Sequence, residues 1–231
     1  MKRWARYAGW LAVAAAGAFL ALQLSYLARI WWWKDHDPGA TAFMRARLED
    51  LRRHDPHARL RHAWVPYSRI SASLKRAVVV AEDARFVDHD GFDWEAIEKA
   101  REKNLRRGRI VAGGSTISQQ LAKNLFLSPA RTPWRKGEEA LITVMIEHVM
   151  DKRRILEIYL NVIEWGEDVF GAEAAARHYY GVGAAALGPE ASARLAAMIP
   201  NPRFYDRHRS TRWLERHTQT ILARMPQADL P

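Results

Sequence analysis

Two adjacent carboxylates, Glu82 and Asp83, follow an apolar run in the stretch VVVAEDARFVDHDGFDW, residues 78–94. An acid that a buried helix delivers to a cleft loses hydration, so its pKa rises and it can serve as a general base. If the helix continues past these acids, Glu82, Phe86 and His89 occupy positions i, i+4 and i+7, which lie on one face. The stretch therefore predicts Glu82 as a catalytic base, with Asp83, Phe86 and His89 as candidate substrate-binding residues.

The same stretch also has a structural interpretation. The helix can end at Gly91, with Glu82 paired to Arg85 three residues further on. Acids that belong to structural ion pairs, with no part in catalysis, also occupy such positions. From these residues alone both interpretations stay open.

A second stretch, GGSTISQQLAKN, begins with two glycines and a Ser–Thr pair ahead of a helix. Exposed backbone amides at a helix N-terminus suit an anion. The candidate binding residues here are Gly113, Gly114, Ser115, Thr116, Gln119, Gln120, Lys123 and Asn124. An ordinary capped helix accounts for Ser115 and Thr116 but not for two adjacent glutamines. The stretch therefore favours a surface for sugar hydroxyls and phosphate.

A third stretch, RKGEEALITVMIE, places Arg135 and Glu139 four residues apart, with Lys136 beside them. An exposed pair at this spacing stabilises a helix by only about 0.3–0.5 kcal/mol. Glu139 borders the apolar segment ALITVMI, so a partly desolvated, functional pair is the alternative. Neither interpretation is excluded by the residues themselves.

A fourth stretch, KRRILEIYLNVIEWGEDVFG, begins at Lys152 and is rich in apolar residues at helical spacing. Its polar members Glu157, Tyr159 and Asn161 can support a site from behind, but core packing is the better interpretation. We therefore expect this stretch to build the scaffold.

The elements that position these residues are predicted to be helices. Helical patterns cover residues 42–53, 70–82, 94–108 with Asp93 as N-cap, 117–128, 134–163 as long helical material, 171–181 and 189–199. No strong alternating strand pattern and no internal repeat are present. The fold class is therefore mainly α, with at most a small strand element.

The N-terminus is predicted to be a membrane anchor. No charged residue occurs from Tyr7 to Ala28, and these 22 residues are about the length that crosses a bilayer. Three cations precede the segment, which puts the N-terminus in the cytoplasm by the positive-inside rule. Tryptophans and tyrosines at both ends resemble interfacial belts. A cleaved signal peptide is the alternative, but its apolar region is shorter, about 7–15 residues.

Charge and composition agree with an anionic partner at a membrane. The chain has 231 residues, no cysteine and a net charge of +10, and the part after residue 30, with 32 cations against 26 acids, carries +6. Cysteine-based disulfides and metal sites are therefore excluded. We expect an N-terminal tip and anchor at 1–33, a juxtamembrane linker at 34–63 and one globular domain at 64–231.

Taken in order, the four stretches resemble the signatures of the peptidoglycan glycosyltransferases, glycosyltransferase family 51. EDARFVDHDG is similar to E-D-x-x-F-x-x-H-x-G, GGSTISQQLAKN to G-G-S-T-I-T-Q-Q-L-x-K-N, and RKGEE to R-K-x-x-E. The fourth stretch is similar to K-x-x-I-L-E-x-Y-L-N, and AAMIPNPRFY to a fifth signature. Ser118 stands where the family usually has Thr, and it keeps the hydroxyl. No S-x-x-K or K-T-G motif of a transpeptidase is present, so the chain resembles the monofunctional biosynthetic members.

The resemblance implies a lysozyme-like glycosyltransferase domain with a smaller membrane-facing jaw, expected at residues 92–112. It implies polymerisation of lipid II into linear glycan strands, with release of undecaprenyl pyrophosphate and inversion at the donor anomeric carbon. By this resemblance Glu82 deprotonates the 4-hydroxyl of the acceptor sugar. Lys123, Arg131 and Arg135 lie on the pyrophosphate side, where Glu139, the second catalytic residue, positions that end of the substrate or its cation. Lys136 is a further substrate-binding candidate.

The remaining expectations also follow from the resemblance. No cofactor is required, although Mg²⁺ or another divalent cation is reported for some members, and Asp83 is the candidate ligand. The expected partners are lipid II, the growing strand, membrane lipids along residues 7–33 and cell-division or cell-wall synthesis proteins, but no nucleic acid. The chain is expected in the inner membrane with its catalytic domain in the periplasm.

Two other functions are compatible with parts of the sequence. A lytic transglycosylase or lysozyme-like hydrolase shares the fold and a catalytic Glu but cleaves strands. A non-enzymatic membrane scaffold accounts for the charge but not for the five signatures.

Overall fold

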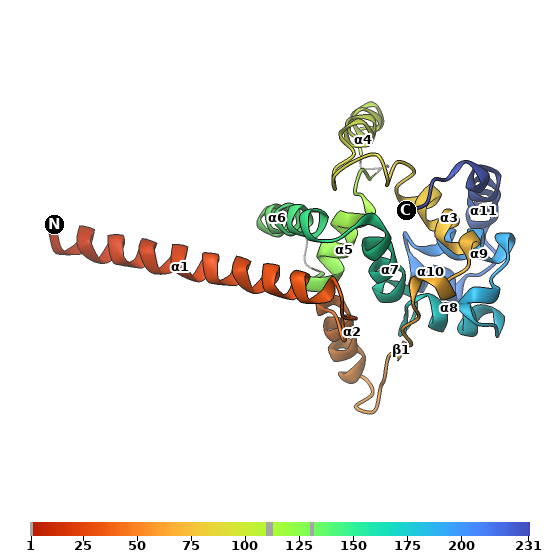
Figure 1. The fold of residues 1–231 in the computed structure, drawn as a ribbon, viewed down its shortest axis with the longest axis horizontal. Helices are drawn as coiled ribbons and strands as arrows, with labels where there is room; N and C mark the ends of the chain where they lie inside the picture. Colours follow the sequence, from red (N-terminus) through yellow and green to blue (C-terminus); the bar gives the residue numbers. More distant parts are fainter. Residues whose placement is uncertain (1, 110–112, 130–131) are drawn as a thin grey trace.

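The computed structural model describes residues 2–109, 113–129 and 132–231 (Figure 1). Its helices are α1 (Lys2–Trp33), α2 (Ala42–Arg52), α3 (Ala72–Glu82), α4 (Trp94–Arg107), α5 (Ile117–Phe126), α6 (Pro133–Val149), α7 (Lys152–Val162), α8 (Ala172–Tyr180), α9 (Pro189–Met198), α10 (Pro202–Arg207) and α11 (Arg212–Arg224). Short 3-10 turns, η1 (Tyr67–Arg69), η2 (Ala184–Ala186) and η3 (Met225–Gln227), join some of them. The prediction of a mainly α fold is confirmed.

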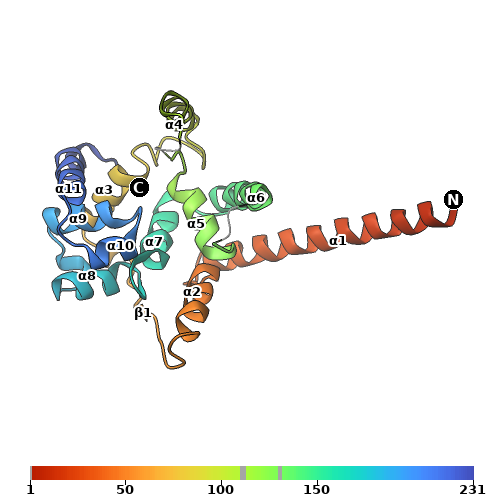
Figure 2. The same ribbon diagram turned by 180° about the vertical axis from the view of Figure 1, so that it is seen from behind.

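Helix α1 projects from the domain as a single rod, which Figures 1 and 2 show from opposite sides. The stretch Arg6–Trp33 is long and apolar enough to cross a membrane. The C-terminal half of the helix packs on the domain: the ring of Phe19 lies 6.0 Å from that of Trp134, the ring of Tyr26 lies 5.0 Å from that of Phe126, and Ile30 is fully buried. The helix therefore leaves most of its apolar surface outside the protein.

A three-stranded sheet is the small strand element that the sequence allows. Strand β3 (Val169–Phe170) lies between β1 (Arg61–His62), which is parallel to it, and β2 (Glu164–Gly166), which is antiparallel. Because β1 pairs with β3 and α2 packs along α5, the segment 34–63 contacts the domain at two places. The division at residue 64 stays a prediction.

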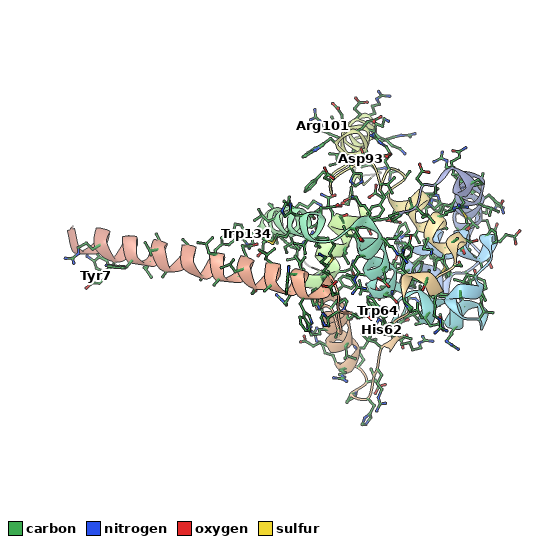
Figure 3. The ribbon with its side chains drawn as sticks, viewed as in Figure 1. Tyr7, His62, Trp64, Asp93, Arg101 and Trp134 are labelled. Atoms are coloured by element: carbon green, nitrogen blue, oxygen red, sulfur yellow. The ribbon has the colours of Figure 1, made fainter. Side chains whose placement is uncertain are left out.

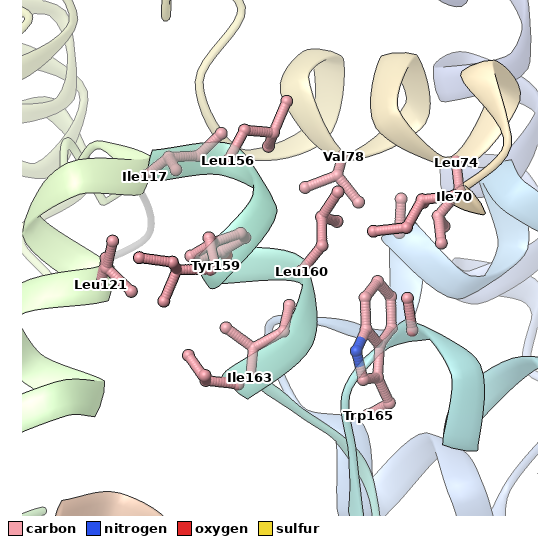
Figure 4. Close-up of a cluster of buried hydrophobic side chains, with 14 of the residues drawn as sticks. Ile70, Leu74, Val78, Ile117, Leu121, Leu156, Tyr159, Leu160, Ile163 and Trp165 are labelled. Carbon is pink, nitrogen blue, oxygen red and sulfur yellow. The ribbon is translucent and has the colours of Figure 1, made fainter. Parts of the chain in front are cut away.

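The core gathers around α7, which passes between α5 and α3 (Figure 4). Leu156, Tyr159 and Leu160 of α7 are fully buried, and so are Leu121 of α5 and Val78 of α3. This packing sets the distance between the helix that carries Glu82 and the helix that carries Lys123. The interpretation of the fourth stretch as scaffold is therefore correct for its apolar residues.

Residues 134–163 were expected as long helical material, but they form two helices. Met150 is extended, with φ −111° and ψ 144°, and the carboxylate of Asp151 accepts a hydrogen bond of 2.7 Å from the backbone N–H of Arg154. Asp151 therefore caps α7 as a new helix, because its side chain satisfies an N–H group that has no partner within the helix.

Helix α4 stands apart from the other helices, in the expected jaw region (Figures 1 and 2). It begins at the predicted N-cap Asp93, which accepts a hydrogen bond from Ala96, and ends at Gly108 with φ 61°. Figure 3 labels Asp93 at its start and Arg101 along it. Residues 110–112, at the end of the predicted jaw, lie outside the described residues.

Candidate active site

Glu82 is the last residue of α3, and the core fixes its position. The helix begins at the N-cap Ser71, whose hydroxyl accepts a hydrogen bond of 3.0 Å from Leu74 N–H, and its buried face packs against α9 and α11. Asp83 then leaves the helix with φ −162° and ψ 74°. A shared helical face for Glu82, Phe86 and His89 is therefore wrong, and so is a helix end at Gly91.

The alternative pairing of Glu82 with Arg85 is also wrong. Arg85 forms an ion pair with Glu95 of α4 and lies 3.8 Å from Asp93. Glu82 is thus left half-buried, with its carboxylate turned to α5.

Asp83 supports the end of α3 rather than facing solvent. Its Oδ2 accepts a hydrogen bond of 3.0 Å from Ile117 N–H, and its Oδ1 lies 2.9 Å from Nε2 of His89. Nδ1 of His89 accepts from Gly91 N–H at 3.2 Å, so Nε2 carries the proton that is donated to Asp83. This buried carboxylate therefore ties the end of α3 to the start of α5.

A chain of hydrogen bonds reaches Glu82 from the core. Nε2 of Gln120 donates to Oε2 of Glu82 at 2.7 Å, and Oε1 of Gln120 accepts from the hydroxyl of Tyr159 at 2.9 Å. Because the tyrosine hydroxyl is a donor here, it fixes the orientation of the amide and presents the NH₂ group to the carboxylate.

Burial raises the pKa of Glu82 above its ordinary value. The hydrogen bond from Gln120 and the charge of Lys123 oppose this rise, and the negative charge of Asp83 adds to it. A desolvated carboxylate that remains hydrogen-bonded on one oxygen is suited to accept a proton.

The N-terminus of α5 is satisfied within the protein. Thr116 and Gln119 form a capping box, in which Thr116 Oγ1 accepts from Gln119 N–H and Gln119 Oε1 accepts from Thr116 N–H. With Ile117 N–H bonded to Asp83, these three amides are not available to an anion. The expectation of a row of exposed amides is therefore wrong at Thr116, Ile117 and Gln119, because capping groups satisfy such donors.

Two glycines and Ser115 nonetheless border a cavity. Gly113 and Ser115 are exposed, and a Cβ on Gly114 would lie 2.9 Å from Cα of Ile97. Glycine is therefore required at 114 for α4 to approach this loop.

Three cations surround the buried carboxylate of Glu139: Lys123 of α5, and Arg135 and Lys136 of α6, the helix that also carries Glu139. Nη1 of Arg135 lies 2.8 Å from Oε2 of Glu139, and Lys136 forms an ion pair with Oε1 of the same residue. Burial lowers the pKa of Lys123, and the charge of Glu139 opposes that shift. With one acid among three cations, the cluster has an excess of positive charge that suits a phosphate group.

Two cavities meet at the Glu82–Gln120 pair. The base cavity, of about 440 Å³, is lined by Glu82, Asp83, Asp93, the loop 113–116 and residues around them. The cationic cavity, of about 560 Å³, is lined by Gln120, Lys123, Asn124, Arg135, Glu164, Arg203 and residues around them. A third cavity, of about 650 Å³, lies beneath α4 and is bordered by Gln119 and Lys136.

Some of the expected site residues are not in contact with these cavities. Phe86 is fully buried under Lys152, whose Nζ lies 4.7 Å from the ring centre, so the expectation that it binds substrate is corrected to core packing. His89 donates to Asp83 and accepts a hydrogen bond from Gly91 N–H, and so it stabilises the turn after α3. Arg131 lies outside the described residues.

Asp83 does not fit a divalent cation in this arrangement, because both of its oxygens hold protein groups. Among the described residues no group of three or more His, Asp or Glu side chains is placed to hold a metal ion.

Two side chains near the cavities have no sequence signal of their own, because Glu164 and Arg203 belong to a strand and a helix far apart in the chain. Tyr159 carries only the weak signal of a polar residue in an apolar helix, where core packing is the better interpretation. Only the tertiary fold brings them to the cationic cavity or to Gln120. Glu157 and Asn161, by contrast, bind the backbone of Tyr67 and Val65 and are structural.

Comparison with known proteins adds an independent result. A family profile described as Transglycosylase matches residues 49–226. The chain is 62% identical over 218 residues to a biosynthetic peptidoglycan transglycosylase of Chromobacterium violaceum, covering 94% of this chain and 96% of that protein. It is 60% identical over 231 residues to the biosynthetic peptidoglycan transglycosylase of Dechloromonas aromatica, covering all of both chains.

Proposed function

The chain belongs to the transglycosylase family and is therefore a peptidoglycan glycosyltransferase, and we propose that Glu82 is its general base. The enzyme extends glycan strands, and its substrates are lipid II and the growing strand. The acceptor sugar lies in the base cavity with its 4-hydroxyl toward the carboxylate of Glu82. As that oxygen attacks C1 of the donor sugar, its proton passes to Glu82 and the bond from C1 to the pyrophosphate breaks.

The leaving pyrophosphate lies against Lys123, Arg135 and Lys136. These cations offset the charge that develops on the leaving group, which a preorganised site does at little cost in reorganisation. Glu139 holds Arg135 and Lys136 in place through its two ion pairs. Attack from the side opposite the leaving group inverts the α-linked donor to a β-glycosidic bond. Arg131 remains a candidate for the same role.

The observation that carries this assignment is the junction at Gln120. This side chain borders the cationic cavity and donates to Glu82, which borders the base cavity. A base on one side and cations on the other is the arrangement that an in-line transfer requires.

The direct test supplies the full-length protein with fluorescent lipid II and, separately, with finished glycan strands. We expect polymer from lipid II and no change in the strands. Release of soluble anhydro-muropeptides from sacculi, without polymer formation, would contradict synthesis and indicate a lytic enzyme.

The membrane arrangement is part of the proposal. Among the described residues one helix is suited to anchoring, and we place its N-terminus in the cytoplasm because Lys2, Arg3 and Arg6 precede the apolar run. The domain then lies on the outer side. Trp134 of α6 contacts Phe19 of α1 at 6.0 Å between ring centres, and Figure 3 shows it beside that helix. The bilayer that surrounds α1 therefore reaches this end of α6.

Because the chain has no cysteine, one introduced cysteine reports topology. We expect Ser210→Cys, at an exposed position of the domain, to react with a membrane-impermeant maleimide added to spheroplasts. Labelling only after the membrane is opened would reverse the orientation.

A further inference from the structure

Arg224 brings a cation to the base cavity from the C-terminal part of the chain. It is the last residue of α11, and it lines this cavity together with Glu82. Ile221 and Met225, close to it in the sequence, are buried, and both α11 and η3 pack against α3, the helix that ends at Glu82. The core therefore fixes the backbone of Arg224 beside the base cavity, although this residue lies outside the five signatures.

The other charged groups around Arg224 already have partners. Arg85 and Lys99 both pair with Glu95 of α4, and the two aspartates that line the cavity accept hydrogen bonds from backbone N–H groups. Arg224 is exposed and forms no hydrogen bond or ion pair with a described residue. Its guanidinium is therefore available to an anionic ligand in the cavity.

The acceptor carries two kinds of anionic group that a guanidinium binds. One is the carboxylates of its stem peptide, and the other is the pyrophosphate that joins its sugars to the lipid. Arginine suits a carboxylate because two parallel N–H groups match the two oxygens. A cavity of about 440 Å³ accommodates one small ligand, so an anion at Arg224 and a hydroxyl at Glu82 belong to the same acceptor.

The place of α11 in the fold favours the peptide over the pyrophosphate. Figures 1 and 2 show α11 on the side of the domain that is away from α1. The lipid of the acceptor stays in the bilayer that surrounds α1, and the pyrophosphate is attached to that lipid. The peptide is attached to the sugar and is free of the membrane, so it is the anionic part that reaches α11.

We propose that Arg224 determines specificity for the acceptor by binding a carboxylate of its stem peptide while the 4-hydroxyl lies at Glu82. This rests on the proposed function, since it takes the base cavity as the acceptor site. The contact is made equally in the ground state and the transition state, so it lowers the KM for the acceptor and leaves kcat unchanged.

The test separates acceptor from donor on the full-length protein. The donor is a labelled lipid II whose 4-hydroxyl is capped, so that it cannot serve as an acceptor. The acceptor is lipid II with free peptide carboxylates or, in a second series, the same molecule with these carboxylates amidated. The initial rate of label transfer against acceptor concentration gives the KM for each acceptor.

With the unchanged protein, amidation should raise the KM for the acceptor about fivefold, the effect of losing one exposed ion pair. Arg224→Ala should raise the KM for the charged acceptor by a similar factor and leave the KM for the amidated acceptor unchanged. The kcat should stay within about twofold throughout. Arg224→Lys keeps the charge without the paired N–H groups, so its KM for the charged acceptor should fall between the other two.

Arg216→Ala is the matched control. Arg216 lies on the same helix, is exposed and lines none of the three cavities at the site. This variant should leave both KM values unchanged. Thermal melting checks that each variant is folded, and the comparison of the two acceptors on the unchanged protein needs no variant at all.

Three outcomes would contradict these expectations in different ways. Equal rises of both KM values in Arg224→Ala would place the pyrophosphate or a sugar at this arginine and reject the peptide contact. Unaltered KM values for both acceptors would make Arg224 a solvated surface cation and reject the proposal. Absence of transfer from the capped donor in the unchanged protein would reject the proposed function instead.

Discussion

Nε2 of Gln120 lies 2.7 Å from Oε2 of Glu82 and donates a hydrogen bond to it. This contact joins the end of α3 to the first turn of α5, and it occupies one carboxylate oxygen while the other remains for a substrate. The hydroxyl of Tyr159 holds the far side of the same amide. Three side chains from three helices thus determine where the base lies, and the contact with Gln120 opposes the rise of its pKa that burial causes.

Glu82→Gln should abolish glycan synthesis while preserving the fold. The amide cannot accept a proton from the acceptor hydroxyl, and general-base catalysis contributes a factor of about 10²–10⁴. The rate of polymer formation from fluorescent lipid II measures this loss, with circular dichroism as the check on folding. Polymerisation at the normal rate would remove Glu82 from the mechanism.

Tyr159→Phe should shift the acidic limb of the pH–rate profile to higher pH. Without the hydroxyl donor, the amide of Gln120 is free to turn its oxygen toward Glu82, which disfavours the carboxylate and raises its pKa further. A base is active only when deprotonated, so activity falls as the pH drops through that pKa. In the variant this fall begins at a higher pH. The kcat/KM against pH, for lipid II, measures the effect.

Tyr179→Phe is the control for this change, because its hydroxyl donates to the carbonyl of Trp165 at 2.8 Å and takes no part in the Glu82 chain. It should leave the acidic limb in place. A general loss of rate in Tyr159→Phe without a shift of the limb would mean that the tyrosine only fills the core.

The sequence predicts those parts of the site that depend on local patterns. The apolar spacing of α3 places Glu82 at a helix end, and Asp93 and Gly108 mark both ends of α4 because capping residues act within a few residues of one another. Arg135 and Glu139 pair as their spacing of four implies.

The rest depends on contacts between distant segments. The helix ends at Glu82 because Asp83 turns to cap α5, whose first residue is 34 positions further along the chain. No local pattern encodes that partner, and so helical spacing predicts a shared face for Glu82, Phe86 and His89 that the structure does not have. Glu164 and Arg47 likewise meet only through the packing of α2 beside β2.

Asp83→Ala should destabilise the domain more than it impairs chemistry. It leaves Ile117 N–H and the ring N–H of His89 without their acceptor in a buried place, and each such loss costs about 1–3 kcal/mol. The melting temperature in detergent should fall by several degrees, at about 2–4 °C per kcal/mol for a domain of this size.

At low temperature, where the variant stays folded, its rate of polymerisation should fall much less than that of Glu82→Gln. Asp88→Ala, in the same loop but exposed, should melt like the unchanged protein. A rate as low as that of Glu82→Gln in folded Asp83→Ala would instead give Asp83 a direct part in the reaction.

Lys123→Arg should extend activity to higher pH. Burial lowers the pKa of Lys123, and the charge of Arg135 adds to this effect while that of Glu139 opposes it. A lysine with a lowered pKa loses its charge sooner as the pH rises, so the site then loses a cation that stabilises the leaving pyrophosphate. Arginine remains protonated throughout this range, and the basic limb of the kcat/KM profile should therefore move to higher pH. The different shape of the arginine side chain lowers the maximum rate.

Lys136→Arg is the control. Lys136 is half-exposed, and this change should leave the basic limb where it is. A basic limb that is the same in Lys123→Arg and the unchanged protein would assign it to another group.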